Sequence, residues 1–171
     1  MKLQTTLALT LPLISSWAIG ADMSVKFEIP KLAVAEYHKP YIAMWLERAD
    51  QSVVSTLAVL YEVRKRDNGG AKYLKDIRQW WRKAGRDLAL PIDGVSGATR
   101  GPGEQTLSFG PERVNFDKLP AGDYQLVIEA ARESGGRELV RLPVRLPLKG
   151  KQSASASGKE ELGAVSLQIT P

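Results

Sequence analysis

Residues 93–100 read Asp-Gly-Val-Ser-Gly-Ala-Thr-Arg and hold the side chains best placed to take part in chemistry. Very small residues precede Thr99, so its hydroxyl can enter the cleft of another protein without steric hindrance. A phosphate on that hydroxyl would be stabilised by positive charge nearby. The candidate basic residues are Arg82, Lys83, Arg86 and Arg100. The same small residues also suit a Gly-rich turn in which Ser and Asp side chains bond to backbone amides, and this alternative stays open.

Residues for conventional catalysis are scarce. The chain has one histidine, His38, and no cysteine, which excludes thiol chemistry and a thiolate metal site. A lone histidine without cysteine also disfavours zinc, so we expect no metal. A serine hydrolase needs a base beside its nucleophile, and nothing in the pattern marks His38 as one. We therefore expect His38 at the surface or a strand edge, with its role left open, and expect the protein not to be an enzyme.

The N-terminal residues 1–21 have the pattern of a secretory signal peptide. Lys2 precedes an apolar run over residues 7–14, and small residues at 18–21 predict cleavage after Gly20 or Ala21. A membrane anchor is the alternative, but a spanning helix needs about 20 apolar residues and this run is shorter. We expect a periplasmic protein that does not span the membrane after cleavage.

The remaining residues, 22–171, are of a usual size for a single domain. The whole chain has 24 Lys and Arg against 19 Asp and Glu, a formal net charge of +5. Because the basic residues are spread out, they do not form the concentrated patch of a nucleic-acid-binding protein. We expect no nucleic-acid partner.

Alternating apolar residues predict about seven strands. Residues 41–46 are apolar on both faces, which predicts a central strand covered from two sides. Residues 53–63 should be the next strand, with Leu57, Val59, Tyr61 and Val63 on one face. The other predicted strands lie near residues 25–29, 107–109, 124–130, 140–146 and 162–169. The strands near residues 124–130 and 140–146 should form a hairpin with a three-residue loop at 134–136. This loop sets Glu129 opposite Arg141.

Residues 71–84 change to a helical period. Leu74, Ile77 and Trp81 fall on one face, which predicts an amphipathic helix with Trp81 in the core. Trp80 should lie farther round the helix and be partly exposed, and stacking on a flavin ring is an open alternative for it. Residues 85–122 should be a long Gly/Pro-rich loop and residues 149–159 a flexible loop. The fold expected is mainly β, an immunoglobulin-like β-sandwich with one inserted amphipathic helix.

The segment from Asp93 to Thr99 resembles the acceptor motif Asp-x-x-Ser-Gly-Ala-Thr of bacterial flavin transferases. The resemblance implies that such an enzyme takes FMN from FAD, with magnesium, and esterifies the Thr99 hydroxyl. The residues that would form the FMN site are Thr99, Asp93, Ser96, Gly97, Ala98 and Arg100. The motif occurs in extracytoplasmic subunits of electron-transfer complexes, so it implies covalent FMN as the cofactor and a flavin transferase as a partner.

Longer segments resemble one family over nearly all of the predicted mature chain. They are residues 37–47, 79–81, 93–100 and 121–126. In this order they are similar to the predicted periplasmic proteins of domain-of-unknown-function family 2271. The resemblance implies association with flavin transferases and with PepSY-type membrane flavin reductases, sometimes in iron uptake. We therefore expect a periplasmic electron-transfer protein that carries FMN on Thr99. The alternative is a non-enzymatic β-sandwich that binds a membrane redox or iron-uptake partner.

Overall fold

The computed structural model describes residues 20–171, and most of the predicted signal peptide, residues 1–19, lies outside the described residues. Nine strands account for most of the regular structure. They are β1 (Asp22–Ile29), β2 (Tyr41–Arg48), β3 (Val53–Tyr61), β4 (Ser96–Ala98), β5 (Gly103–Phe109), β6 (Gly122–Ala131), β7 (Arg137–Leu146), β8 (Gln152–Ser157) and β9 (Ala164–Thr170). The helical segments are the 3-10 helices η1 (Arg66–Asp76), η2 (Gly85–Asp87) and η3 (Phe116–Lys118) and the α-helix α1 (Arg78–Lys83).

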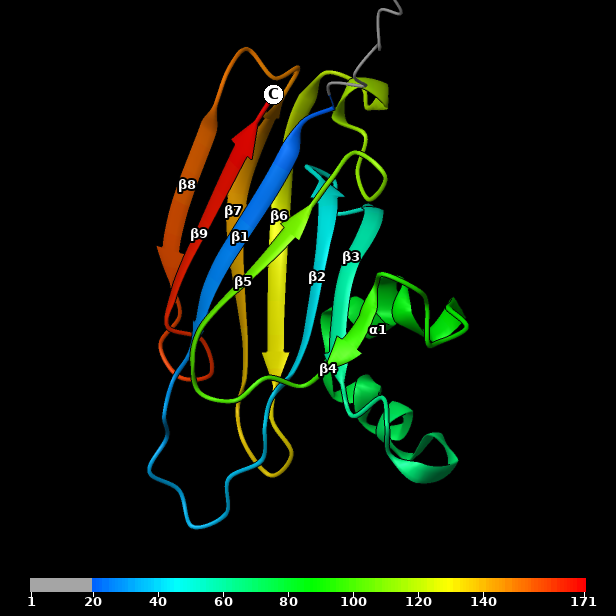
Figure 1. The fold of residues 1–171 in the computed structure, drawn as a ribbon, viewed down its shortest axis with the longest axis vertical. Helices are drawn as coiled ribbons and strands as arrows, with labels where there is room; N and C mark the ends of the chain where they lie inside the picture. The colour runs from blue at the N-terminus through cyan, green and yellow to red at the C-terminus, as the bar shows by residue number, and fades with distance from the viewer. Residues whose placement is uncertain (1–19) are drawn as a thin grey trace, which may run out of the picture.

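The strands form two sheets that pack face to face. One has the order β5-β1-β9-β8 and the other β4-β3-β2-β6-β7. Neighbouring strands are antiparallel except β3 and β4, which run parallel. Figure 1 shows the helical segments η1 and α1 beside β3 and β4, outside the sandwich. The prediction of a mainly β sandwich is confirmed.

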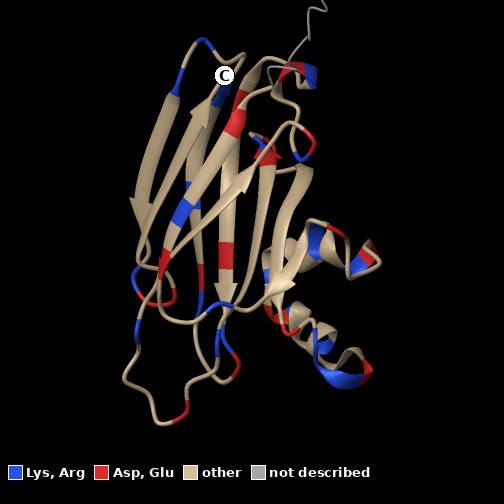
Figure 2. Cartoon of the chain, viewed as in Figure 1, with Lys and Arg blue, Asp and Glu red and all other residues tan. Residues whose placement is uncertain are grey.

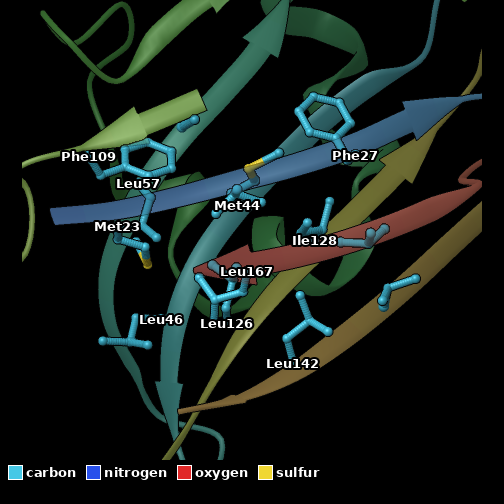
Figure 3. Packing of buried hydrophobic residues seen from close by; sticks show 14 of the residues in the cluster. Met23, Phe27, Met44, Leu46, Leu57, Phe109, Leu126, Ile128, Leu142 and Leu167 are labelled. Atoms are coloured by element: carbon cyan, nitrogen blue, oxygen red, sulfur yellow. The ribbon is translucent and has the colours of Figure 1, made fainter. Parts of the chain in front are cut away.

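The core between the sheets is made by the alternating apolar residues of the strands. Phe27, Met44, Leu126 and Leu167 point from opposite sheets into this layer (Figure 3) and are at most 1% exposed. Burial of one such side chain contributes about 1.5–3 kcal/mol. The predicted inward sets of β6 and β7 all belong to this core: Tyr124, Leu126, Ile128, Ala130, Val140, Leu142, Val144 and Leu146.

A second core lies on the other face of the five-stranded sheet. The inner residues of η1 and α1, Leu74, Ile77 and Trp80, cover Trp45 and Tyr61 there. The strand β2 is therefore buried on both faces, as its continuous apolar run predicts.

The turn before β6 has a feature shared with immunoglobulin-like sandwiches. The hydroxyl of Tyr124 donates a hydrogen bond to the carbonyl oxygen of Pro120 at 2.8 Å. Such a tyrosine corner fixes the entry of a strand into the sandwich.

The prediction that Leu57 lies on the same face of β3 as Val59 and Tyr61 is wrong. Leu57 lies in the core between the sheets, whereas Val59 and Tyr61 lie in the second core. The cause is a bulge: Met44 pairs with Ala58 but its neighbour Trp45 pairs with Thr56, which leaves Leu57 as the extra residue. A bulge of this kind reverses the alternation beyond it.

The prediction of one continuous helix over residues 71–84 is also wrong. The chain forms the 3-10 helix η1 and then α1, and the break between them is at Ile77, which has φ −77° and ψ 72°. The buried residues are Leu74 in η1, Ile77 at the break and Trp80 in α1. As a result Trp80, and not Trp81, enters the core.

Two predicted loops contain strands. β4 and β5 lie within residues 85–122, and β5 pairs with β1 from Met23 to Ile29. β8 lies within the predicted flexible loop 149–159. Its alanines, Ala154 and Ala156, pack on the core, so the Ser/Ala sequence is an alternating strand with small side chains.

The loop of the β6–β7 hairpin is longer than predicted, but the numbers of paired residues still sum to an even value. Glu129 faces Leu139 and not Arg141, because the loop has five residues, 132–136. The side chain of Glu161 fixes this loop by accepting hydrogen bonds from the Arg132 guanidinium and from the Gly136 amide. With this register, the inward-facing residues of β6 and those of β7 lie on the same face of the sheet and enter one core.

Candidate functional site

The motif at residues 93–99 is a turn followed by an edge strand. Ser96 closes the turn: its amide donates to the carbonyl oxygen of Ile92 at 2.8 Å, and its hydroxyl accepts from the Ile92 amide at 3.0 Å. Asp93 is exposed in that turn. The buried Val95 then fixes the strand, since its carbonyl accepts the amide of Val59 at 2.9 Å. Ser96 therefore bonds to a backbone amide through its side chain, as expected if this segment is a Gly-rich turn.

The small residues of the motif have different surroundings. Gly97 faces Leu60, and a Cβ at Gly97 would come within 2.9 Å of the Leu60 Cδ2. Ala98 and Arg100 are exposed, while Thr99 is partly buried between them. The Thr99 amide donates to the carbonyl oxygen of Tyr61 at 3.2 Å, which holds the backbone at the end of β3.

Thr99 lines a pocket of about 270 Å³ whose wall includes three tyrosines. The three aromatic residues come from different places: Tyr37 from the β1–β2 loop, Tyr41 from β2 and Tyr73 from η1. The other lining residues are His38, Lys39, Glu62, Asp76, Ala131 and Glu133. The fold thus brings the single histidine and three tyrosines to the threonine that the motif singles out.

The hydroxyl of Tyr37 is buried and has no hydrogen-bond partner among residues 20–171. Burial raises the pKa of Tyr37, so the group stays protonated and is a free donor at neutral pH. Burial likewise raises the pKa of Tyr41, whose hydroxyl already donates to Glu62 Oε2 at 3.3 Å. The charged groups that act on the Tyr37 hydroxyl are those of Arg132 and Glu161, which do not line the pocket, so this hydroxyl faces away from Thr99.

A second hollow also includes Thr99. It is lined by Ala98 and Thr99 together with residues 61–65 at and after the end of β3, among them Glu62, Arg64 and Lys65. The Lys65 ammonium binds Glu62 at 2.9 Å and lies 5.1 Å from the centre of the Tyr73 ring. The hydrogen bond from Lys65 lowers the pKa of Glu62. Arg64 and Lys65 share this hollow with Thr99, as Lys39 shares the first, and the sequence reasoning identified none of the three.

The predicted phosphate contacts from the helix are wrong for Lys83. Its ammonium binds Glu47 Oε2 at 2.7 Å, at the end of β2 that pairs with Val53. Thr99 bonds instead to Tyr61, at the end of β3 that pairs with Ile42. Five residues of extended strand, roughly 17 Å, separate those two ends. The other two helix residues bond backbone carbonyl oxygens of their own segment: Arg82 to that of Arg78 and Arg86 to that of Arg82.

Lys83 belongs to a buried ionic group that stabilises the fold. The carboxylate of Glu47 is 1% exposed and also accepts hydrogen bonds from the Trp45 indole and the Arg141 guanidinium. Burial alone would raise the pKa of Glu47, but these hydrogen bonds outweigh it and hold the pKa below its ordinary value. These residues are structural and not part of the candidate site.

The prediction that Trp80 is partly exposed is wrong. Its side chain is fully buried, and its indole N–H donates to the Thr56 hydroxyl at 3.1 Å. Gly85 lies against the ring so closely that a Cβ there would come within 2.6 Å of it. Trp80 therefore cannot stack on a flavin, and the partly buried Trp81 lies outside the pocket beside Thr99.

His38 lies between two carboxylates. Its Nε2 is 3.2 Å from Glu36 Oε1, and its Nδ1 is 3.8 Å from Glu133 Oε2. Within residues 20–171, no three His, Cys, Asp or Glu side chains are grouped closely enough to hold a metal ion. Figure 2 shows the basic and acidic residues interspersed over both sheets and the helical segments in this view.

The comparison with protein families gives one match. The model of a family described as predicted periplasmic protein, DUF2271, matches residues 22–164. No curated protein and no solved structure matches the chain. Over the described range 20–171, no helix is long and apolar enough to cross a membrane. The chain therefore belongs to the DUF2271 family of predicted periplasmic proteins, and its location is the periplasm.

Proposed function

We propose that this protein carries FMN covalently on Thr99 and transfers electrons in the periplasm. The observation that carries the proposal is the position of Thr99 on the rim of two hollows of different chemistry. Three tyrosines line one hollow, Arg64 and Lys65 line the other, and Glu62 lines both. A flavin nucleotide has the same two parts, a flat aromatic ring system and an anionic phosphate.

The residues present fit that group in three respects. The exposed Ala98 and Arg100 leave the approach to Thr99 open on both sides. The Lys65 ammonium and the Arg64 guanidinium supply charge for a phosphate. Tyr41 and Tyr73, which line the pocket beside Thr99, supply aromatic surface for the ring. When bound, FMN supplies electron transfer, and the chain itself positions the group and shields one side of it.

A flavin transferase with magnesium makes the proposed attachment, as the motif at residues 93–99 implies. The Thr99 Oγ attacks the flavin-side phosphorus of FAD. One O–P bond forms, the diphosphate bond breaks, AMP leaves, and the hydroxyl proton passes to the transferase or solvent. Under this proposal the redox partner is a PepSY-type membrane flavin reductase.

The test is intact mass spectrometry after co-expression of the full chain with an active flavin transferase. We expect the mature protein to gain the mass of one FMN less one water, with in-gel flavin fluorescence. Thr99→Ala should abolish the gain, Thr99→Ser should retain part of it, and Ala98→Leu should lower it by blocking the approach. Thr106→Ala, at an exposed threonine of β5, is the matched control. Wild-type protein without added mass, with several active transferases, refutes the proposal.

A module that only binds a membrane redox or iron-uptake partner is the second candidate. The observation that favours it is Val34, which is 42% exposed and is the one large apolar side chain of residues 20–171 that is exposed. Val34 lies in the loop between β1 and β2, which extends beyond the sandwich (Figure 1). If the wild-type protein stays colourless and unlabelled, this candidate replaces the first.

A further inference from the structure

The loop between β1 and β2 presents an apolar run that the fold does not use. Residues 30–40 join the two strands without regular structure, and the loop extends beyond the sandwich (Figure 1). Its middle reads Leu32-Ala33-Val34-Ala35, and all of these except Leu32 are exposed. Within the described part of the chain, neither Leu32 nor Val34 packs against the core between the sheets or against the second core. Four consecutive apolar residues in such a place indicate a function, because they add nothing to the core.

The β2 side of this loop is fixed to the domain, whereas the apolar run is not. Pro40 is buried, and the Tyr37 hydroxyl is buried close to the charges of Arg132 and Glu161. By contrast, no backbone hydrogen bond joins residues 31–36 to other backbone groups of residues 20–171. The apolar run is therefore held out from the domain and can fit a surface without breaking hydrogen bonds of the fold.

Two lysines flank the run and indicate which kind of surface it fits. Lys31 directly precedes it and Lys39 follows it, and both side chains are exposed. The loop has one carboxylate, that of Glu36, whose Oε1 lies 3.2 Å from His38 Nε2. Two lysines and one glutamate give the loop a net charge of +1 with His38 neutral. A bilayer that contains anionic phospholipids matches both features, because apolar side chains enter the boundary beneath the headgroups and lysines meet the phosphates.

A lipid surface fits this loop better than a protein partner does. The binding energy of protein interfaces is concentrated in Trp, Tyr and Arg side chains, and Leu and Val are under-represented there. Residues 32–35 include no such anchor, and the hydroxyl of the one loop tyrosine, Tyr37, is buried within the domain. The run is also too short to cross a bilayer, and backbone groups without hydrogen bonds are too costly in the hydrocarbon core. Contact is therefore confined to the headgroup region and is reversible.

We propose that residues 31–39 form a membrane-contact loop that binds the surface of bilayers containing anionic phospholipids. Such contact needs no flavin, so it goes beyond the proposed function. Tyr37, His38 and Lys39 of the same loop line the pocket beside Thr99. Contact through this loop therefore holds Thr99 close to the membrane, on the side of the domain that faces a membrane reductase under the proposed function.

The first test measures whether the tip of the loop enters the lipid surface. The chain has no cysteine, so a single introduced cysteine carries a fluorophore at one place. Val34→Cys in the mature protein is labelled with the polarity-sensitive fluorophore nitrobenzoxadiazole. The matched control is Ala121→Cys, at an exposed alanine at the opposite end of the sandwich. With vesicles of phosphatidylcholine and phosphatidylglycerol in equal parts, we expect emission at residue 34 to rise and shift to the blue and emission at residue 121 to stay unchanged.

The second test separates the apolar contribution from the charged one. Cosedimentation with the same vesicles at low salt measures the binding of each variant. Val34→Ser should weaken binding about fivefold, because less apolar surface enters the boundary. Lys31→Gln should also weaken it about fivefold, and Glu36→Gln should strengthen it by a similar factor. Lys151→Gln, in the loop after β7 at the opposite end, is the matched control and should bind as wild type. Circular dichroism shows that each variant is folded.

The outcomes are distinct. A blue shift at residue 34 that depends on phosphatidylglycerol, with opposite effects of Lys31→Gln and Glu36→Gln, supports the membrane-contact loop. Unchanged emission at residue 34, or equal changes at residues 34 and 121, overturns it. A shift with native membranes but not with protein-free vesicles also overturns it and assigns the loop to a protein partner. None of these results depends on labelling of Thr99, so failure of the proposed function is seen separately.

Discussion

The carboxylate of Glu129 joins the helical segment to the five-stranded sheet, and its removal is the most informative test of the fold around the site. It is fully buried on β6. It accepts the backbone amides of Gln79 and Trp80 at 3.0 and 2.9 Å, and the Arg137 guanidinium at 2.7 Å. These amides belong to the first turn of α1, where they have no partner within the helix. Glu129→Ala therefore leaves α1 without its cap.

The expected cost follows from the groups left without partners. The Trp80 amide is buried and the Gln79 amide is partly buried. Each buried donor without an acceptor costs about 1–3 kcal/mol, and the loss of one partner of a buried ion pair costs about 3–5 kcal/mol. Arg137 is 37% exposed and can turn to water. We expect Glu129→Ala to lower the free energy of unfolding by about 3–4 kcal/mol. Glu129→Gln, which keeps one acceptor oxygen, should lower it by about 1–2 kcal/mol.

Urea unfolding followed by tryptophan fluorescence measures both values. Trp80 and Trp45 lie in the core that Glu129 helps to close, so their emission reports its opening. Glu104→Ala is the matched control, because Glu104 forms an exposed pair with Lys26 and should contribute less than about 1 kcal/mol. A loss below about 1 kcal/mol for Glu129→Ala would show that the helical segment does not depend on this cap.

Three further predictions concern the core, the motif and the response to acid. Trp80→Ala should cost about 3–5 kcal/mol in urea unfolding, and Trp81→Ala less than half of that, because only Trp80 is fully buried. Gly97→Leu should cost about 1–3 kcal/mol because of its close approach to β3, whereas Gly101→Ala, with no atom within 4 Å of the added Cβ, should be nearly neutral. The carboxylate of Glu138 accepts the backbone amides of residues 159–162. Burial opposes its ionised form, but these hydrogen bonds outweigh burial and lower the pKa of Glu138. Its contribution to stability is therefore full above the ordinary glutamate pKa and lost as the pH falls through the lowered value. Thermal unfolding of Glu138→Gln should thus differ most from wild type near pH 7 and converge with it as the pH falls through the lowered pKa of Glu138.

The parts of the fold that could be predicted are those where side-chain period decides the structure. The alternation in β1, β6 and β7 identifies their inward residues, and the continuous apolar run of β2 predicts burial on both faces. In each case the apolar pattern is long enough to have one interpretation. The bulge at Leu57 escapes this reasoning because an extra residue leaves no mark on the local sequence.

The candidate site could be predicted only in part because long-range pairing forms it. The motif identifies Thr99, but the parallel pairing of β4 with β3 brings it to Tyr41 and Lys65. Nothing in the spacing of residues 93–99 encodes that partner strand. A signal was present in the polar residues 64–66 directly after β3, and it gains meaning only once β4 is placed beside that strand. Trp80 was misplaced because one helical period was applied across residues 71–84, whereas the backbone breaks at Ile77 and α1 begins after it in a new orientation.

The pairing of β4 with β3 also sets the entropy of any reaction at Thr99. The segment before the threonine is already extended and is held at its two ends by the hydrogen bonds of Val95 and Thr99 to β3. Fixing the backbone of a free loop costs about 1–2 kcal/mol per residue, and an enzyme that binds a flexible acceptor must supply that free energy from its own contacts. In this domain the cost is met when the sheet folds. Under the proposed function, a transferase that recognises the extended segment finds its substrate preorganised, so folding would make Thr99 a better acceptor than the same residues in an unfolded chain.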